Sequence, residues 1–157
     1  MQLLHVPTGV LVHLVTMSPI TKVYAGRLAG MVVRGPDTEV IGRVRDVVVI
    51  VRPNGHVTRA LGLVVEVVRR IFLPMLRVAS IEPQEIMLVS GSVSLRAFKP
   101  RTGELTIVGD LVGSKVQVDD PELENLHGRP VEIADIELER TRTRDWIVSR
   151  VAVFGEA

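Results

Sequence analysis

Three arginines alternate with threonines near the C-terminal end of the chain, at Arg140, Arg142 and Arg144. They lie at the predicted tip of the second long hairpin, between the strands 131–139 and 146–154, where alternation would place all three guanidinium groups on one side. Guanidinium groups bind phosphate oxygens, so the segment is a candidate contact for RNA or for an anionic lipid surface. No aromatic residues interleave for base stacking, and short charged runs usually mark a solvated face. The neighbouring acids expected to pair with the arginines are Glu137, Glu139 and Asp145.

Four carboxylates lie within seven residues in the segment 119–125. Oxygen ligands of this kind suit hard cations such as Mg²⁺. The segment lacks the alternating acids and the central glycine of a calcium-binding loop, and Pro121 restricts its backbone. A solvated loop is therefore the default and no metal site is assigned. The weak candidate ligands are Asp119, Asp120, Glu122 and Glu124.

No set of residues has the pattern of a catalytic site. The chain has no cysteine, its four histidines are scattered, and it contains no phosphate-binding glycine loop or nucleophile elbow. We therefore expect no catalytic residue and no cofactor, and a protein that is not an enzyme. The lack of cysteine fits a reducing compartment, and we expect a cytoplasmic location.

The composition favours strands and disfavours a nucleic-acid partner. Valine accounts for 29 of the 157 residues, and only 5 residues are aromatic. Branched side chains of this kind suit a pleated surface. The 19 basic and 18 acidic residues leave a net charge of +1, without the large basic excess of most phosphate-binding proteins. No apolar run reaches the ~18 residues of a membrane span, which leaves only peripheral association with a membrane open.

Short apolar segments separated by turns follow one another from residue 24 onward. Asn54 and Gly55 supply the positive φ angles that a tight hairpin requires. No long amphipathic helix is predicted. The strands that these patterns predict are 47–51, 61–67, 71–74, 86–89, 105–108, 115–118, 131–139 and 146–154.

The second half of the sequence repeats the first. A leucine between two glycines recurs 83 positions later, and further matches follow after insertions in turns. The glycines let a strand bend at a barrel corner, and an aspartate precedes each long hairpin. Since Asp commonly binds nearby backbone amides, we expect both aspartates to be structural. The matched pairs are Gly26 with Gly109, Leu28 with Leu111, Gly30 with Gly113, Gly42 with Gly128, Asp46 with Asp135, Leu61 with Ile147, Val65 with Val151, and Val67 with Val153.

This pattern resembles the PRC-barrel family, the small β-barrel of the photosynthetic reaction centre H subunit and of the C-terminal part of the ribosome maturation factor RimM. The segments that carry the resemblance are 27–33, 39–47 and 61–67. More narrowly, residues 24–154 look like the N-terminal tandem PRC region of actinobacterial MgtE-type magnesium transporter proteins, which also contain CBS domains. The supporting segments are 70–75, 109–111 and 142–148.

We expect an all-β chain made of two small PRC-type β-barrels related by internal duplication, with little helix. The expected divisions are an N-terminal extension at 1–23, the first barrel at 24–90, a linker at 91–103 and the second barrel at 104–157. The second copy lacks a counterpart of the segment 71–89, so its barrel is incomplete or is completed by another segment.

The resemblance implies a non-enzymatic adaptor or regulatory module for protein assembly, linked to MgtE-type magnesium transport. The expected partner is an MgtE-type or CBS-containing protein, or a second copy of the chain. The alternative is an RNA- or ribosome-associated barrel similar to the C-terminal domain of RimM, which would bind through Arg140, Arg142 and Arg144.

Overall fold

A computed structural model describes residues 2–5, 11–14, 19–52, 56–117 and 128–154. Most of the described chain is strand, which confirms the predicted all-β class with little helix. The strands are β1 (Gln2–His5), β2 (Leu11–Leu14), β3 (Lys22–Tyr24), β4 (Val32–Arg34), β5 (Val40–Ile50), β6 (Arg59–Glu66), β7 (Arg70–Pro74), β8 (Val78–Ile81), β9 (Glu85–Leu88), β10 (Glu104–Thr106), β11 (Lys115–Gln117), β12 (Pro130–Arg140) and β13 (Trp146–Val153).

Three short helical turns interrupt the strands. They are α1 (Ala25–Leu28), the 3-10 turn η1 (Met75–Arg77) and the π-helical turn η2 (Ile107–Leu111). Within the described residues, no helix is long and apolar enough to cross a membrane.

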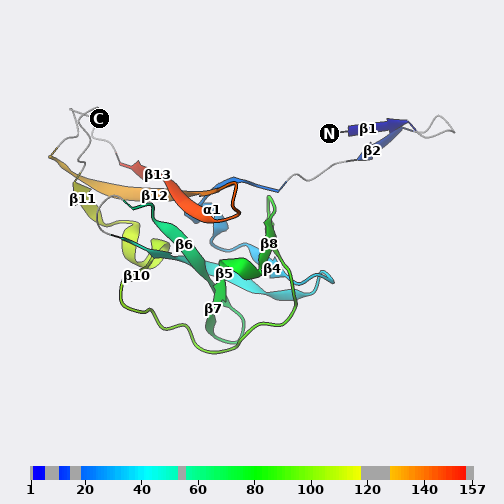
Figure 1. Cartoon of the computed structure of the whole chain (residues 1–157), viewed down its shortest axis with the longest axis horizontal. Coiled ribbons are helices and arrows are strands. Elements are labelled where there is room, and N and C mark those ends of the chain that lie inside the picture. Colours follow the sequence, from blue (N-terminus) through cyan, green and yellow to red (C-terminus); the bar gives the residue numbers. More distant parts are fainter. Residues whose placement is uncertain (1, 6–10, 15–18, 53–55, 118–127, 155–157) are drawn as a thin grey trace.

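One curled sheet, shaped as a half-barrel, contains strands from both halves of the chain (Figure 1). Its main path runs β11-β12-β13-β6-β5-β4-β9-β8, and β3, β7 and β10 attach to strands of this path. Neighbouring strands are antiparallel except β4 and β9, which are parallel. β1 and β2 pair with each other in a separate two-stranded sheet. The two halves thus share one sheet where the sequence predicts two barrels.

The halves are joined by an exchange of short strands. β3, from the first half, pairs with β12, so that Val23 lies opposite Leu138. β10, from the second half, pairs with β5, so that Leu105 lies opposite Val49. Each half therefore contributes a short strand that pairs with the long hairpin of the other half. These two pairings join strands of both halves in one continuous sheet.

The turns that follow β3 and β10 have matching backbone hydrogen bonds. Gly30 follows α1 with a φ of 93°, and Gly113 follows η2 with a φ of 86°. The Gly30 N–H donates to the carbonyl of Val44 at 2.7 Å, and the Gly113 N–H donates to that of Ile133 at 2.8 Å. Glycine adopts this left-handed conformation without the steric cost that a side chain would add. These contacts support the internal duplication, which stays a prediction.

Asp46 is a buried acceptor that connects the halves. The residue is only 7% exposed. Its carboxylate accepts hydrogen bonds from the backbone N–H groups of Val47 at 2.8 Å, Val108 at 2.7 Å and Gly109 at 2.8 Å. Since an unpaired buried N–H is costly, this carboxylate stabilises the start of the η2 turn. The prediction that Asp46 is structural is confirmed.

Asp135 has the corresponding place on β12. It accepts the N–H of Ile136 at 2.8 Å and that of Gly26, in α1, at 3.0 Å. A break in strand register precedes each aspartate, at Ala134 in β12 and at Arg45 in β5. Such bulges bend a strand and redirect its side chains. Each aspartate therefore binds the turn of the other half.

Strand pairing corrects one match of the sequence repeat. Gly42 lies opposite Val33 in the first half, whereas Val131 lies opposite Val116 in the second. The shift of 83 positions places Val116 at the position of Val33, so Val131 takes the place of Gly42. Gly128 instead lies in the turn before β12, where its φ is 74°. The sequence pattern aligns the two glycines because an arginine follows each of them, Arg43 and Arg129.

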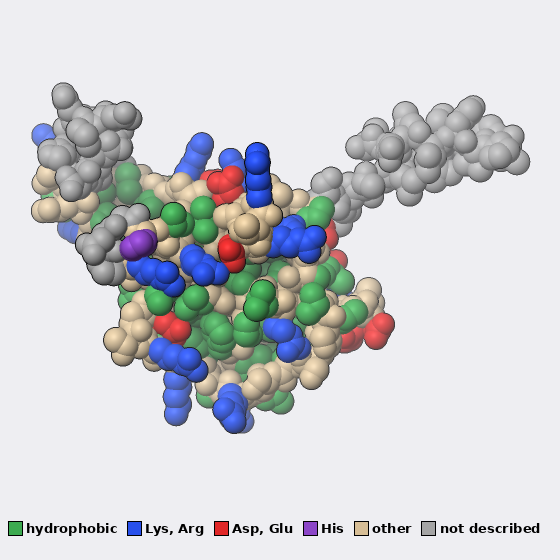
Figure 2. All heavy atoms as spheres, viewed as in Figure 1, with side chains coloured by type: hydrophobic (Ala, Val, Ile, Leu, Met, Phe, Trp, Pro, Cys, Tyr) green, Lys and Arg blue, Asp and Glu red, His purple; other side chains and the backbone are tan. Residues whose placement is uncertain are grey.

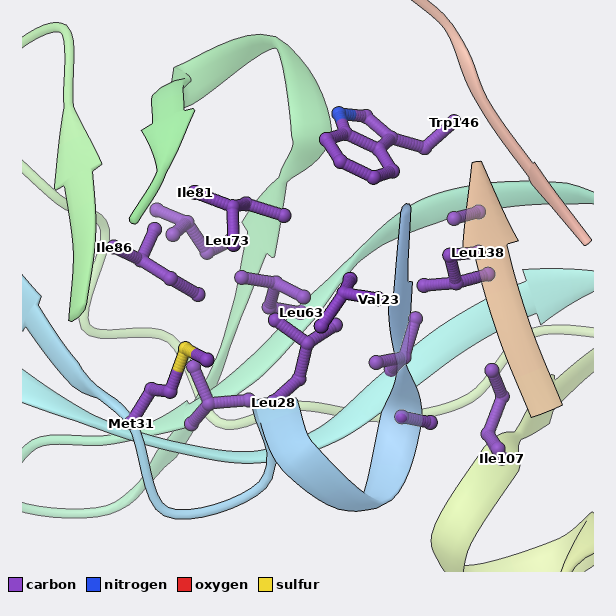
Figure 3. Close-up of a cluster of buried hydrophobic side chains, with 14 of the residues drawn as sticks. Val23, Leu28, Met31, Leu63, Leu73, Ile81, Ile86, Ile107, Leu138 and Trp146 are labelled. Carbon is purple, nitrogen blue, oxygen red and sulfur yellow. The ribbon is translucent and has the colours of Figure 1, made fainter. Parts of the chain in front are cut away.

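Side chains from both halves form one hydrophobic core (Figure 3). Leu28 and Leu63 from the first half pack in the same cluster as Ile107 and Leu138 from the second, and all four are fully buried. Trp146, 7% exposed, belongs to this cluster at the end of the β12–β13 hairpin. Burial of each such side chain contributes about 1.5–3 kcal/mol. The shared core makes the two halves depend on each other.

The expected linker at 91–103 lies against β7. Ala97 forms an isolated antiparallel bridge with Ile71, and the Phe98 N–H donates to the Arg70 carbonyl at 2.8 Å. This segment runs along the lower side of the molecule in Figure 1, between β9 and β10. The domain boundaries predicted from the sequence remain a prediction.

Candidate functional site

The tip arginines, defined as Arg140, Arg142 and Arg144, lie where β12 turns into β13. Arg140 ends β12, and the Thr141 N–H donates to the Asp145 carbonyl at 2.7 Å to close a tight turn. Within this turn Arg144 has a φ of 65°. The predicted position at the tip of the second long hairpin is confirmed. Since the residues after Arg140 form a turn rather than an extended strand, alternation does not determine the side on which each guanidinium lies.

The acids around the hairpin tip pair with cations other than the tip arginines. Asp145 accepts a hydrogen bond from the Arg59 guanidinium at 2.9 Å, which links the tip to β6. Among the described residues, no ion pair is recorded for any tip arginine. The expectation that these acids neutralise the tip arginines is wrong. The other two pairs join Lys22 to Glu139 at 3.7 Å and Arg150 to Glu137 at 3.9 Å.

A groove of about 550 Å³, the hairpin groove, separates the hairpin tip from β8 and η1. Arg140 and Arg144 line it together with Arg59, and Trp146 and Met75 contribute apolar surface. Arg142 is not among the lining residues. The structure thus brings two of the three tip arginines to one concave surface, beside a buried aromatic ring.

A second groove, of about 560 Å³, lies between β7 and the segment 93–101, and we call it the aromatic groove. Phe72 and Phe98 line it with stacked rings whose centroids are 6.2 Å apart and whose planes differ by 21°. Glu104 also lines it and accepts the backbone N–H of Arg101. The basic residues of its lining are Arg77, Arg96, Lys99 and Arg101.

The turn η1 forms the boundary between the two grooves. Pro74, just before η1, lines both of them. Leu76 stands on η1 with 90% of its surface exposed, and it also lines the hairpin groove. Leu76 therefore places an exposed apolar side chain beside two concave surfaces.

Positive charge dominates the linings of both grooves. Together they contain seven arginine or lysine side chains and two acidic ones, Glu104 and Asp145. Asp145 is already paired with Arg59. Figure 2 shows Lys and Arg side chains around hydrophobic ones over β7 and the segment that follows β9. This surface therefore attracts negatively charged groups, although the whole chain has a net charge of only +1.

Most of this surface was not identified from the sequence. The sequence predicts a linker at 91–103, whereas the structure shows that this segment brings Arg96, Lys99 and Arg101 together with Phe98. One signal was available: residues 86–103 contain these three cations and no acidic residue. Such a local excess of positive charge indicates a binding surface more directly than the net charge does.

The structure offers no metal site in the residues that it describes. No group of three or more His, Cys, Asp or Glu side chains lies close enough there to hold an ion. The weak candidates Asp119, Asp120, Glu122 and Glu124 lie outside the described residues. Asp46 is engaged by backbone amides, as described above, and so has a structural role.

The described residues thus form an all-β fold with a concave, basic and partly apolar surface. A family model described as the actinomycete SH3 domain matches residues 105–157, the last third of the chain. The matched segment contains β11, β12 and β13 and the tip arginines. Similarity to an SH3-type domain suggests interaction with proteins. Comparisons with curated proteins and with solved structures gave no match.

Proposed function

We propose that this chain is a non-enzymatic adaptor or regulatory module that binds an acidic segment of another protein. The observation that supports this proposal is the pair of basic grooves on either side of η1, with the exposed Leu76 between them. Apolar side chains at the centre of an interface supply most of its affinity, and surrounding charges set the choice of partner and the association rate.

The sequence resemblance suggests which protein this partner is. Tandem PRC regions occur in MgtE-type magnesium transporter proteins, so an MgtE-type or CBS-containing protein is the proposed partner, on the cytoplasmic side of the membrane. The match to an SH3-type family model supports a protein partner in general. Self-association through the same surface is the competing outcome.

Binding to the purified soluble CBS region of an MgtE-type protein tests the proposal. In isothermal titration calorimetry, we expect Leu76→Asp to weaken binding at least tenfold, because it places a negative charge and removes the apolar anchor where an acidic partner docks. The matched control is Val68→Asp, since Val68 is 77% exposed and lines neither groove. We expect the control to bind within twofold of the wild-type chain.

Salt dependence supplies the second measurement. Affinity for an acidic partner should fall as NaCl is raised, because screening weakens attraction to the exposed cations of the grooves. Equal affinities of the wild-type chain and Leu76→Asp would overturn the proposed surface. A concentration-dependent dimer that Leu76→Asp dissociates, with no binding of the CBS region, would replace the partner by a second copy of the chain.

RNA is the second candidate ligand, and one observation favours it. Arg140 and Arg144 line a groove and have no ion pair within the described part of the chain. If RNA binds there, structured RNA should be retained in a filter-binding titration at low salt, and Arg144→Ala should weaken retention. Absence of binding at low salt, or equal binding by the wild-type chain and Arg144→Ala, would eliminate this candidate.

A further inference from the structure

We propose that the outer edge of β13 pairs with the same edge of a second copy of the chain, in an antiparallel arrangement centred on Ala152. β13 lies beside β12 along the upper side of the molecule in Figure 1, and its outer edge is the one turned away from β12. Of the residues of β13, only Trp146 lines a groove, so this inference does not depend on the ligand of the grooves.

The outer edge of β13 is open where the matching edge of β6 is paired. Val65 of β6 and Val153 of β13 occupy matching positions, because their partners on β5 and β12 accept equivalent backbone bonds from the turn glycines. β7 pairs with the outer edge of β6 from Gly62 to Glu66. Within the described residues, no strand pairs with the outer edge of β13 beyond its contact with β6 at Ile147 and Val148.

The backbone groups of two residues on this edge point away from β12. The Phe154 N–H donates to the Glu132 carbonyl, just outside the paired part of β12, at 3.0 Å. Because the N–H and C=O groups of successive residues point to opposite sides of an antiparallel strand, those of Val153 and Val151 point outward. The register break nearest to these residues has its extra residue on β12, at Ala134, so it leaves the alternation along β13 intact. Both residues therefore offer a donor and an acceptor to an added strand.

Apolar side chains beside this edge are uncovered. Val151 is 47% exposed, whereas Leu63, at the matching position of β6, is fully buried. Val151 lies opposite the buried Ile136, so it is on the core side of the sheet. Phe154 is 60% exposed. A strand added here would bury apolar surface as well as pair the backbone groups.

A second copy fits this edge and leaves no outward N–H unpaired. With Ala152 opposite Ala152 of the second copy, Val151 of each copy lies opposite Val153 of the other. Both of these are hydrogen-bonded pairs, because the backbone groups of both residues point outward. The twofold axis therefore pairs every outward N–H and C=O of the two valines in both copies.

The side chains that meet across this axis are also complementary. Arg150 lies opposite Phe154 of the second copy, on the face that carries Ala152. A guanidinium group beside an aromatic ring is a favourable pair, and the Arg150 side chain is 72% exposed and available for it. Arg150 is the one charged residue from 150 to 154, so no like charges lie directly opposite each other.

The chain already contains one pairing of this kind, which favours a second copy over an unrelated strand. β6 and β13 meet in antiparallel orientation where Arg59 lies opposite Ile147. These residues also occupy matching positions, because each lies the same number of residues before Val65 or Val153. The outer edges of β6 and β13 thus pair across an approximate twofold axis within the chain. Pairing of identical surfaces across a twofold axis is the commonest arrangement of protein dimers.

A disulfide trap in the full chain tests the register. The chain has no cysteine, so Ala152→Cys introduces a single thiol. In this register the two copies of residue 152 form a pair without hydrogen bonds, whose Cα atoms lie about 4.5 Å apart, within the range of a disulfide. We expect Ala152→Cys to form a covalent dimer under copper–phenanthroline oxidation at least tenfold faster than Arg150→Cys. Arg150 is on the same face and edge, but its two copies lie far apart along the paired strands.

Sedimentation velocity measures the dimer without a covalent bond. We expect the wild-type chain to dimerise as its concentration rises, and Val151→Pro to weaken the dimer at least tenfold, because proline removes an outward N–H and no bond to β12. Val151→Thr is the matched control, since it keeps the N–H and the branched shape, and it should dimerise within threefold of the wild-type chain. Leu76→Asp should also dimerise normally, because Leu76 lies at the hairpin groove.

Several results would overturn this inference. A wild-type chain that stays monomeric up to ~1 mM would do so, and would leave the edge of β13 to a strand of another protein. Equal oxidation rates of the two cysteine variants, or a dimer that Leu76→Asp dissociates, would do the same. If thermal denaturation shows that Val151→Pro does not fold, hydrogen exchange of the wild-type chain decides. The amides of Val151 and Val153 should exchange more slowly as the concentration rises, and unchanged rates would contradict the pairing.

Discussion

The two halves of the molecule share one structural unit but differ in what surrounds it. In both halves a short helical turn ends at a glycine with positive φ, and an aspartate on a long strand of the opposite half binds that turn. In the first half, the outer edge of β6 pairs with β7 over the whole length of β7. In the second half, the corresponding edge of β13 pairs with β6 at a single position, where Ile147 lies opposite Arg59.

This difference shows where the candidate binding surface comes from. The shared unit forms the core and the exchanged strands, and its two aspartates bind backbone N–H groups. Both grooves are lined by residues of β7, η1 or the segment 93–101, which have no counterpart in the second half. The matched parts thus form the scaffold, and the unmatched segment provides most of the surface that is available to a ligand.

Among the changes that test this comparison, separation of the two halves should disturb folding most. We expect residues 19–90 and residues 91–157, produced as separate chains, to be unfolded, because each loses an exchanged strand and part of the common core. The measurement is the dispersion of amide signals in a two-dimensional NMR spectrum. Mixing the two chains should restore dispersion. A dispersed spectrum from either chain alone would show that the exchange is dispensable.

Replacement of either aspartate should have the next largest effect, a loss of folding stability. We expect Asp46→Ala to lower the free energy of unfolding by about 3 kcal/mol, because it leaves three backbone N–H groups without their acceptor. Asp135→Ala should cost about 1–2 kcal/mol, since two donors are affected. Urea denaturation measures both, with Asp46→Asn as the control that keeps the side-chain shape. An equal or larger cost at Asp135 would contradict the difference between the halves.

The two turn glycines should show the smallest and most equal effects. Gly30 and Gly113 have φ values of 93° and 86°, and among the described atoms none lies within 4 Å of an added β-carbon at either position. Replacement by alanine should therefore cost about 1–2 kcal/mol at each site through backbone conformation alone. Thermal denaturation of the two variants checks this. A difference above ~1 kcal/mol would mean that the turns are not equivalent.

Local structure could be predicted from the sequence because its causes are local. A run of valines predicts a strand within β5, alternating apolar residues predict β6, and apolar segments predict β7, β9, β12 and β13. The repeat was aligned imperfectly along the second hairpin: Val65 pairs with Val44, and Val153 pairs with Ile133, so Val153 rather than Val151 corresponds to Val65. A shift of two residues keeps the same side of a strand, so the hydrophobic pattern cannot detect it.

Contacts between distant segments could not be predicted in the same way. Nothing in the local pattern of Lys22–Tyr24 indicates that it pairs with β12 rather than with its own half. The alternation of the tip arginines was also misleading, because a turn can occur within an alternating segment that contains no glycine or proline. Arg144 adopts a positive φ there, supported by hydrogen bonds of Thr141.

The strand exchange also constrains how the chain folds as it is synthesised. Gly26 binds Asp135, which lies 109 residues later in the chain, and β3 needs a strand from the same distant hairpin. During synthesis the N-terminal half leaves the ribosome first, but β3 lacks its partner strand until residues 130–140 have also been synthesised. Contacts this far apart also slow folding, because a long loop must close before they form. The first half therefore cannot complete its sheet until the hairpin of β12 and β13 has been synthesised.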